Sequence, residues 1–96
     1  MNMLLIICPE ARQEELRALI HRHGVHAYTE LTNIVGEGQT GKKMGTFAHP
    51  EKSVLVFIVL EEARQVELLA ALRQFQAGLY PGEGLRVFVL PVTEAV

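Results

Sequence analysis

Residues 54–60 read VLVFIVL, a stretch without a single polar residue, and this stretch decides the fold class. An unbroken apolar run of this length is typical of a β-strand that is covered on both faces. The N-terminal run MLLIIC, residues 3–8, has the same character. We therefore expect these two segments to be the central strands of one sheet.

An amphipathic helix is predicted after each central strand. Pro9 and Glu10 suit the first turn of the first helix, and Gly24 can end it. One side of this helix, opposite the charged residues, carries Ala11, Leu16, Leu19, Ile20 and His23 at roughly helical spacing. Glu61 and Glu62 open the second helix, which Gly78 can close. Its apolar positions are Val66, Leu69, Leu72 and Phe75.

Two further strands complete the pattern. Residues 25–35 are rich in Val, Tyr, Thr and Ile, and residues 85–90 form the last strand, which Pro91 ends or confines to an edge. With right-handed crossovers, the order βαββαβ predicts an α+β, ferredoxin-like domain: a four-stranded antiparallel sheet with two helices on one face. The other face of the two central strands is apolar and uncovered, which predicts a homo-oligomer.

Composition narrows the function classes. With 96 residues, 49% of them hydrophobic and 21% charged, the chain is expected to form a single domain spanning 1–96. A formal net charge of −2 argues against nucleic acid as a partner. The apolar runs are too short to insert in a membrane, and Cys8 is the single cysteine, which favours a reducing, cytoplasmic location.

A long loop is predicted over residues 36–53, GEGQTGKKMGTFAHPEKS, which contain four of the eight glycines and every lysine of the chain. The segment departs from the P-loop pattern because Lys43 stands where a Ser or Thr would hold magnesium. The chain also has no Asp for a second magnesium motif. Closely spaced glycines and the adjacent Lys42 and Lys43 can still bind an anion. The alternative is a flexible surface loop whose charges keep it soluble.

A second glycine turn, Gly82-Glu83-Gly84, precedes Arg86. Alone it is weak evidence, because turns before strands often contain glycine. If neighbouring subunits pack around an axis, the two glycine-containing segments can line one cleft and face a shared ligand.

Neither metal chemistry nor nucleophilic catalysis is strongly indicated. His21 and His23 are two apart on a helix and point about 200° apart, so a structural role is expected for them. The alternative is a divalent-metal site made of His26, His49 and Glu51 across a subunit boundary. Cys8 is expected to be inert packing, and Ser53, the single serine, has no pattern that would orient it. We therefore expect no enzymatic activity.

The chain resembles the PII-like signalling proteins, which are relatives of the nitrogen regulatory P-II proteins. The resemblance spans nearly the whole chain. It rests on the order of the elements and on three segments, which are Tyr28-Thr29-Glu30-Leu31, Gly36-Glu37-Gly38-Gln39-Thr40-Gly41 and Gly82-Glu83-Gly84 with Arg86-Val87-Phe88-Val89.

This resemblance implies a homotrimer that binds an adenine nucleotide (ATP, ADP or AMP) between subunits, requires no cofactor, and docks its large loop onto a target enzyme or transporter. The ligand-binding residues expected on this basis and from the loop pattern are Gly36, Gly38, Gln39, Gly41, Lys42, Lys43, Gly82, Gly84 and Arg86. Arg86 would replace the basic residue that follows the second glycine turn directly in P-II proteins, where this chain has Leu85. The loop contains no tyrosine, so control by tyrosine uridylylation is not expected. The alternative is a trimeric protein similar to the divalent-cation-tolerance proteins, with the three metal ligands given above.

Overall fold

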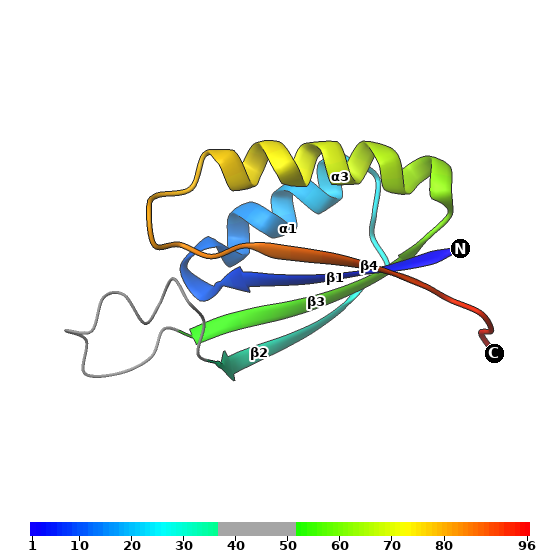
Figure 1. Cartoon of the computed structure of the whole chain (residues 1–96), viewed down its shortest axis with the longest axis horizontal. Helices are drawn as coiled ribbons and strands as arrows, with labels where there is room; N and C mark the ends of the chain where they lie inside the picture. Colours follow the sequence, from blue (N-terminus) through cyan, green and yellow to red (C-terminus); the bar gives the residue numbers. More distant parts are fainter. Residues whose placement is uncertain (37–51) are drawn as a thin grey trace.

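Strands and helices follow one another along the chain in the order βαββαβ that the sequence predicts (Figure 1). The computed structural model describes residues 1–36 and 52–96. Its elements are β1 (Asn2–Pro9), a 3-10 turn η1 (Glu10–Arg12), α1 (Gln13–Arg22), β2 (Thr29–Val35), β3 (Lys52–Leu60), α3 (Glu62–Ala77) and β4 (Arg86–Pro91).

The two apolar runs form the two central strands, as predicted. The strand order is β2-β3-β1-β4, and every neighbouring pair is antiparallel. In the β1–β3 register Leu4 lies opposite Ile58, and Ile6 lies opposite Val56. Both α-helices cover the same face of this sheet (Figure 1). The ferredoxin-like prediction is therefore confirmed.

The hydrophobic core lies between the sheet and the two helices. It consists of alternate residues of the central strands, one stripe from each helix and two loop residues. These residues are Leu4, Ile6, Cys8, Leu16, Leu19, Ile20, Val25, Val54, Val56, Ile58, Leu60, Leu68, Leu72 and Leu85.

The prediction for the second helix was wrong at Val66, which was expected on the buried face. Val66 is 66% exposed, whereas Leu68 and Leu72 are fully buried. Residues two apart on a helix point about 200° apart, so the stripe that buries Leu68 turns Val66 toward solvent. On the first helical segment, Ala11 and His23 are likewise exposed rather than part of the core.

Two strand boundaries also differ from the prediction. β2 begins at Thr29 instead of Val25, because the Val25 N–H donates to the Ile20 carbonyl in the turn that follows α1. Asn33 has a φ of 57° and lies in an irregularity of the β2–β3 ladder. β3 begins at Lys52, so Lys52 and Ser53 belong to the strand rather than to the predicted loop.

The second face of the sheet is apolar and is covered by no element in the described ranges. We call it the open sheet face. Its residues, which alternate with the core residues along each strand, are Met3, Leu5, Ile7, Leu31, Leu55, Phe57, Val59, Phe88 and Leu90. Leu5 lies at its centre, opposite Phe57 on one side and Phe88 on the other.

Candidate functional site

The base of the long loop and the second glycine turn lie at the same end of the sheet. β2 ends at Val35, which lies opposite Lys52, the first residue of β3. β4 begins at Arg86, which lies opposite Ile7 near the end of β1. The base of the long loop and the turn before β4 therefore share this end, which Figure 1 shows on the left. The antiparallel order of the strands produces this placement.

Within one chain, however, these two segments are not in contact across the sheet. β3 and β1 lie between β2 and β4. Since neighbouring strands are about 4.8 Å apart, the two edge strands are separated by about 14 Å. The described end of β2 and the start of β4 are therefore too far apart within one chain to contact the same phosphate group directly.

The second glycine turn has a defined conformation. Gly82 has a φ of 93°, a backbone conformation that favours glycine. The Glu83 N–H donates to the Tyr80 carbonyl at 3.0 Å, and the Tyr80 N–H donates to Glu83 Oε1 at 2.8 Å. These two bonds close the turn on itself.

Arg12, which lies in η1 and is distant from the turn in sequence, binds this turn. Its Nε and Nη2 donate to the two carboxylate oxygens of Glu83, each at 2.9 Å, and its Nη1 donates to Glu15 at 2.9 Å. The guanidinium group also lies over the Tyr80 ring, 5.1 Å from its centroid. The bond from Arg12 lowers the pKa of the Glu83 carboxyl, and the same pairing raises the pKa of Arg12. We call Arg12, Glu83 and Tyr80 the turn clamp.

The described residues include four of the nine predicted ligand-binding residues. Gly36 is exposed directly after β2, Gly82 and Gly84 are exposed in the turn, and Arg86 is exposed at the start of β4. The other five, Gly38, Gln39, Gly41, Lys42 and Lys43, lie outside the described residues. Sequence reasoning missed Arg12, which is 71 residues from Glu83. Glu83 was visible inside the glycine turn, but no local pattern could assign its partner.

A metal site is not assembled in the described part of the chain. His49 and Glu51 fall outside it, and His26 is exposed. In residues 1–36 and 52–96, no group of three or more His, Cys or Glu side chains could hold a metal ion. His26 instead lies beside His21, with ring centroids 5.1 Å apart, and the Tyr28 hydroxyl is 3.4 Å from His21 Nε2.

Cys8 and Ser53, for which the sequence predicts no role as nucleophiles, lie in strands of the sheet. Cys8 is fully buried at the end of β1, and burial raises its pKa to about 12. The thiol therefore stays protonated at neutral pH and is a poor nucleophile. Ser53 pairs with Pro9 and Ile34 as a residue of β3.

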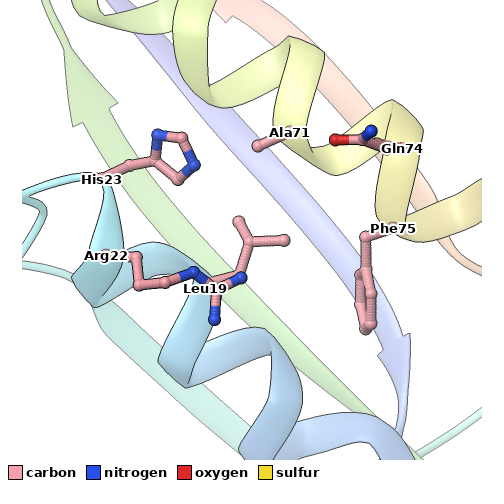
Figure 2. A pocket seen from close by; sticks show the side chains of 6 residues that line it. All are labelled: Leu19, Arg22, His23, Ala71, Gln74 and Phe75. Atoms are coloured by element: carbon pink, nitrogen blue, oxygen red, sulfur yellow. The ribbon is translucent and has the colours of Figure 1, made fainter.

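One open pocket lies in the helical layer, between α1 and α3 (Figure 2). Its volume is about 380 Å³, and its lining includes Arg22 and His23 from the first helix end and Gln74 and Phe75 from α3. None of the nine predicted ligand-binding residues lines it.

A second ion pair connects α1 to β2. Arg17 donates to both carboxylate oxygens of Glu30, at 2.7 and 3.2 Å. The bond from Arg17 lowers the pKa of the Glu30 carboxyl. This pair has the same bidentate geometry as the turn clamp but does not contact the glycine turn, so it provides a matched control for experiments on Arg12.

The two ion pairs predict an acid-dependent loss of stability. Glu30 and Glu83 have lowered pKa values in the folded protein, so the unfolded chain takes up protons first as the pH falls. Their stabilising contribution is present above the ordinary glutamate pKa, about 4.5, and is lost as the pH falls through their folded values. We expect the melting temperature to fall below about pH 4.5 and the variant Arg12→Ala/Arg17→Ala to show a shallower fall. Melting curves between pH 3 and 7 measure this; equal slopes for the two proteins would contradict it.

The sheet order, the helices on one face and the two glycine segments at one end together define a ferredoxin-like α+β protein of the PII-like class. The family description "Nitrogen regulatory protein P-II" matches residues 1–96, so the chain belongs to this family. A search of curated proteins gives no match.

Several solved structures are similar. CPII from Thiomonas intermedia K12, bound to ADP, AMP and acetate, is 25% identical, with 93% of this chain and 82% of that chain covered and a TM-score of 0.72. The same nitrogen regulatory PII-like protein bound to ADP, AMP and bicarbonate is 21% identical, with 99% and 94% covered and a TM-score of 0.67. Its apo form is 22% identical, with 95% and 89% covered and a TM-score of 0.66. No helix in the described residues is long and apolar enough to cross a membrane.

Proposed function

We propose that this chain is a trimeric PII-like regulatory protein that binds an adenine nucleotide between its subunits. The observation that carries the proposal is that the base of the long loop, the second glycine turn and Arg86 all lie at the same end of the sheet, on its two edge strands. Membership of the P-II family and the ADP and AMP bound to CPII support the same ligand class.

The open sheet face supports self-assembly. Leu31, Val59, Phe88 and Leu90 are each more than 40% exposed in the single chain, and they lie around Leu5 and Phe57. A contiguous apolar face of this kind is unfavourable in water and marks an interaction surface. Packing three copies around an axis through this face would bury it in all of them.

Assembly would also complete the nucleotide site. Because about 14 Å separates β2 from β4 within one chain, we propose that the loop base of one subunit faces the glycine turn of the next. Gly36, Gly82 and Gly84 would offer backbone N–H groups to phosphate oxygens, and Arg86 would supply charge. Gly38, Gln39, Gly41, Lys42 and Lys43 are proposed to complete the site.

We propose that nucleotide occupancy is reported by the 36–53 loop. Phosphate groups that recruit the glycines and lysines at the loop base would order the loop, and its conformation would be read by a target enzyme or transporter. The protein would then act as a single-domain regulator without enzymatic activity. Its buried free thiol fits a reducing, cytoplasmic location.

Isothermal titration calorimetry tests the ligand. ADP, AMP and ATP are titrated separately, each with and without bicarbonate, because CPII was found with ADP, AMP and bicarbonate together. We expect a saturable heat with at least one nucleotide and a stoichiometry of one site per chain. Absence of heat with all three nucleotides at millimolar concentration would contradict the nucleotide proposal.

A further inference from the structure

We propose that Arg12 is a positioning residue for the nucleotide site, which it serves by holding and neutralising Glu83. This inference rests on the proposed function, because it assumes that the glycine turn faces a phosphate group. Arg12 would not touch the ligand. It would act by keeping the Glu83 carboxylate away from the phosphate-binding side of the turn.

The geometry of the contact is specific. Arg12 and Glu83 form a bidentate pair in which two parallel N–H bonds of 2.9 Å fix the carboxylate in one plane. Both side chains are mostly buried, with 18% and 17% of their surfaces exposed. The Tyr80 N–H adds a third bond to the same carboxylate. The carboxylate therefore has a single well-defined position.

Leu79 and Leu85 anchor the two ends of the glycine turn to the core by packing, and Arg12 links its tip to another element by hydrogen bonds. The other hydrogen bonds that residues 78–84 form are made within the turn or with the end of α3. Leu85, which is buried, accepts a bond from Gln76, also on α3. Among the described residues, Arg12 provides the side-chain hydrogen bonds that connect the turn to a different element, η1.

Charge gives this link its functional consequence. Glu83 stands between Gly82 and Gly84, whose N–H groups are proposed phosphate ligands. A free carboxylate at this place would repel an anionic ligand over a few ångströms. Paired with Arg12, the Glu83 charge is largely offset, while Glu15, the second partner of Arg12, is 56% exposed and is screened by water. Among the described residues, Arg86 then supplies the positive charge next to the turn. The sequence therefore tolerates an acidic residue inside an anion-binding turn because Arg12 neutralises it.

Four variants test the inference: Arg12→Ala, Glu83→Gln, the double variant Arg12→Ala/Glu83→Gln, and Arg17→Ala as the matched control. Arg17→Ala breaks an equivalent bidentate pair on α1 that does not contact the turn. The readouts are the ADP dissociation constant from calorimetry, the melting temperature, and amide hydrogen exchange of peptides covering residues 78–85.

We expect Arg12→Ala to raise the ADP dissociation constant about tenfold and Arg17→Ala to change it less than about twofold. The two variants should lose a similar amount of melting temperature, because each breaks one bidentate ion pair. The double variant should recover to within about threefold of the wild type, because the uncompensated carboxylate is gone. A purely structural role for Arg12 would not give this recovery. If Arg12→Ala fails to fold, Arg12→Lys keeps the charge without the bidentate bond, so its ADP dissociation constant should stay within about threefold of the wild type. A rise of about tenfold in Arg12→Lys would contradict neutralisation as the role of Arg12.

Three results would overturn the inference: unchanged ADP affinity in Arg12→Ala, equal weakening in Arg17→Ala, or no recovery in the double variant. Failure of the proposed function is distinguishable, because the wild type itself would then bind no adenine nucleotide. In that case amide hydrogen exchange still shows whether Arg12 stabilises the conformation of the turn. Faster exchange of residues 78–85 in Arg12→Ala, but not in Arg17→Ala, supports this role, and unchanged exchange excludes it.

Discussion

Replacing Phe57 by glutamate is expected to convert the proposed trimer into monomers. Phe57 lies on the open sheet face, directly opposite Leu5 of β1 and Thr29 of β2. In the assembled protein this position would be buried, and an unpaired carboxylate there costs several kcal/mol per chain. Because each trimer would contain three such groups, the effect should be close to complete dissociation at micromolar concentration.

Size-exclusion chromatography with light scattering measures this result. The matched control is Val66→Glu, which adds the same charge at a position on α3 that is 66% exposed. We expect the control to remain trimeric and Phe57→Glu to elute as a monomer that keeps its α+β circular dichroism spectrum. A trimeric Phe57→Glu protein would show that the open sheet face is not the interface.

The second large effect is expected at Arg86. The variant Arg86→Glu should weaken ADP binding about a hundredfold, since it removes a charge-assisted bond to phosphate and adds a repulsive carboxylate next to the glycine turn. Arg86 is exposed as the first residue of β4, so the substitution removes no buried contact within the chain. The fold should therefore be retained. Because Arg86 lies opposite Ile7, on the side of the open sheet face, light scattering accompanies the titration, so that a loss of assembly is distinguished from a loss of phosphate binding.

Calorimetry with ADP tests this prediction, with Arg73→Glu as the control. Arg73 is an exposed residue of α3. It carries the same change of charge, so any effect of net charge alone should be equal in the two variants. Equal ADP affinity in Arg86→Glu and Arg73→Glu would remove Arg86 from the proposed site.

The central part of the fold could be predicted because two segments have no polar residue. Residues 3–8 and 54–60 offer no polar side, so they can only be central strands of a sheet that is covered, or becomes covered, on both faces. The same property led directly to the open sheet face. The alternation of buried and less buried residues in β1 and β3 then followed from the strand period of two.

Helix phase and strand ends were less predictable. In α3 apolar residues occur on more than one side, so the sequence pattern could not decide between Val66 and Leu68 for the core. The start of β2 depends on the Val25 bond back to Ile20, which is part of how α1 ends. Such boundaries are determined by hydrogen bonds between segments rather than by the composition of one segment.

The candidate site could be predicted only as far as its glycines and lysines indicate anion binding. Gly82, Gly84 and Arg86 stand together in the sequence, and their placement beside the end of β1 followed from the predicted topology. The turn clamp could not be found in this way. Arg12 lies in a helical segment with several charged residues, and nothing in the spacing distinguishes it from Arg17 or Glu15. Tertiary structure alone pairs it with Glu83.

Native mass spectrometry with added ADP tests the central claim most directly, because it counts chains and nucleotides in the same particle. The account predicts an assembly of three 10.7 kDa chains, about 32 kDa, that takes up as many as three ADP molecules. It also predicts that Phe57→Glu yields monomers without ADP, since the site would lie between subunits. A wild-type monomer, or a trimer that binds no adenine nucleotide, would contradict it.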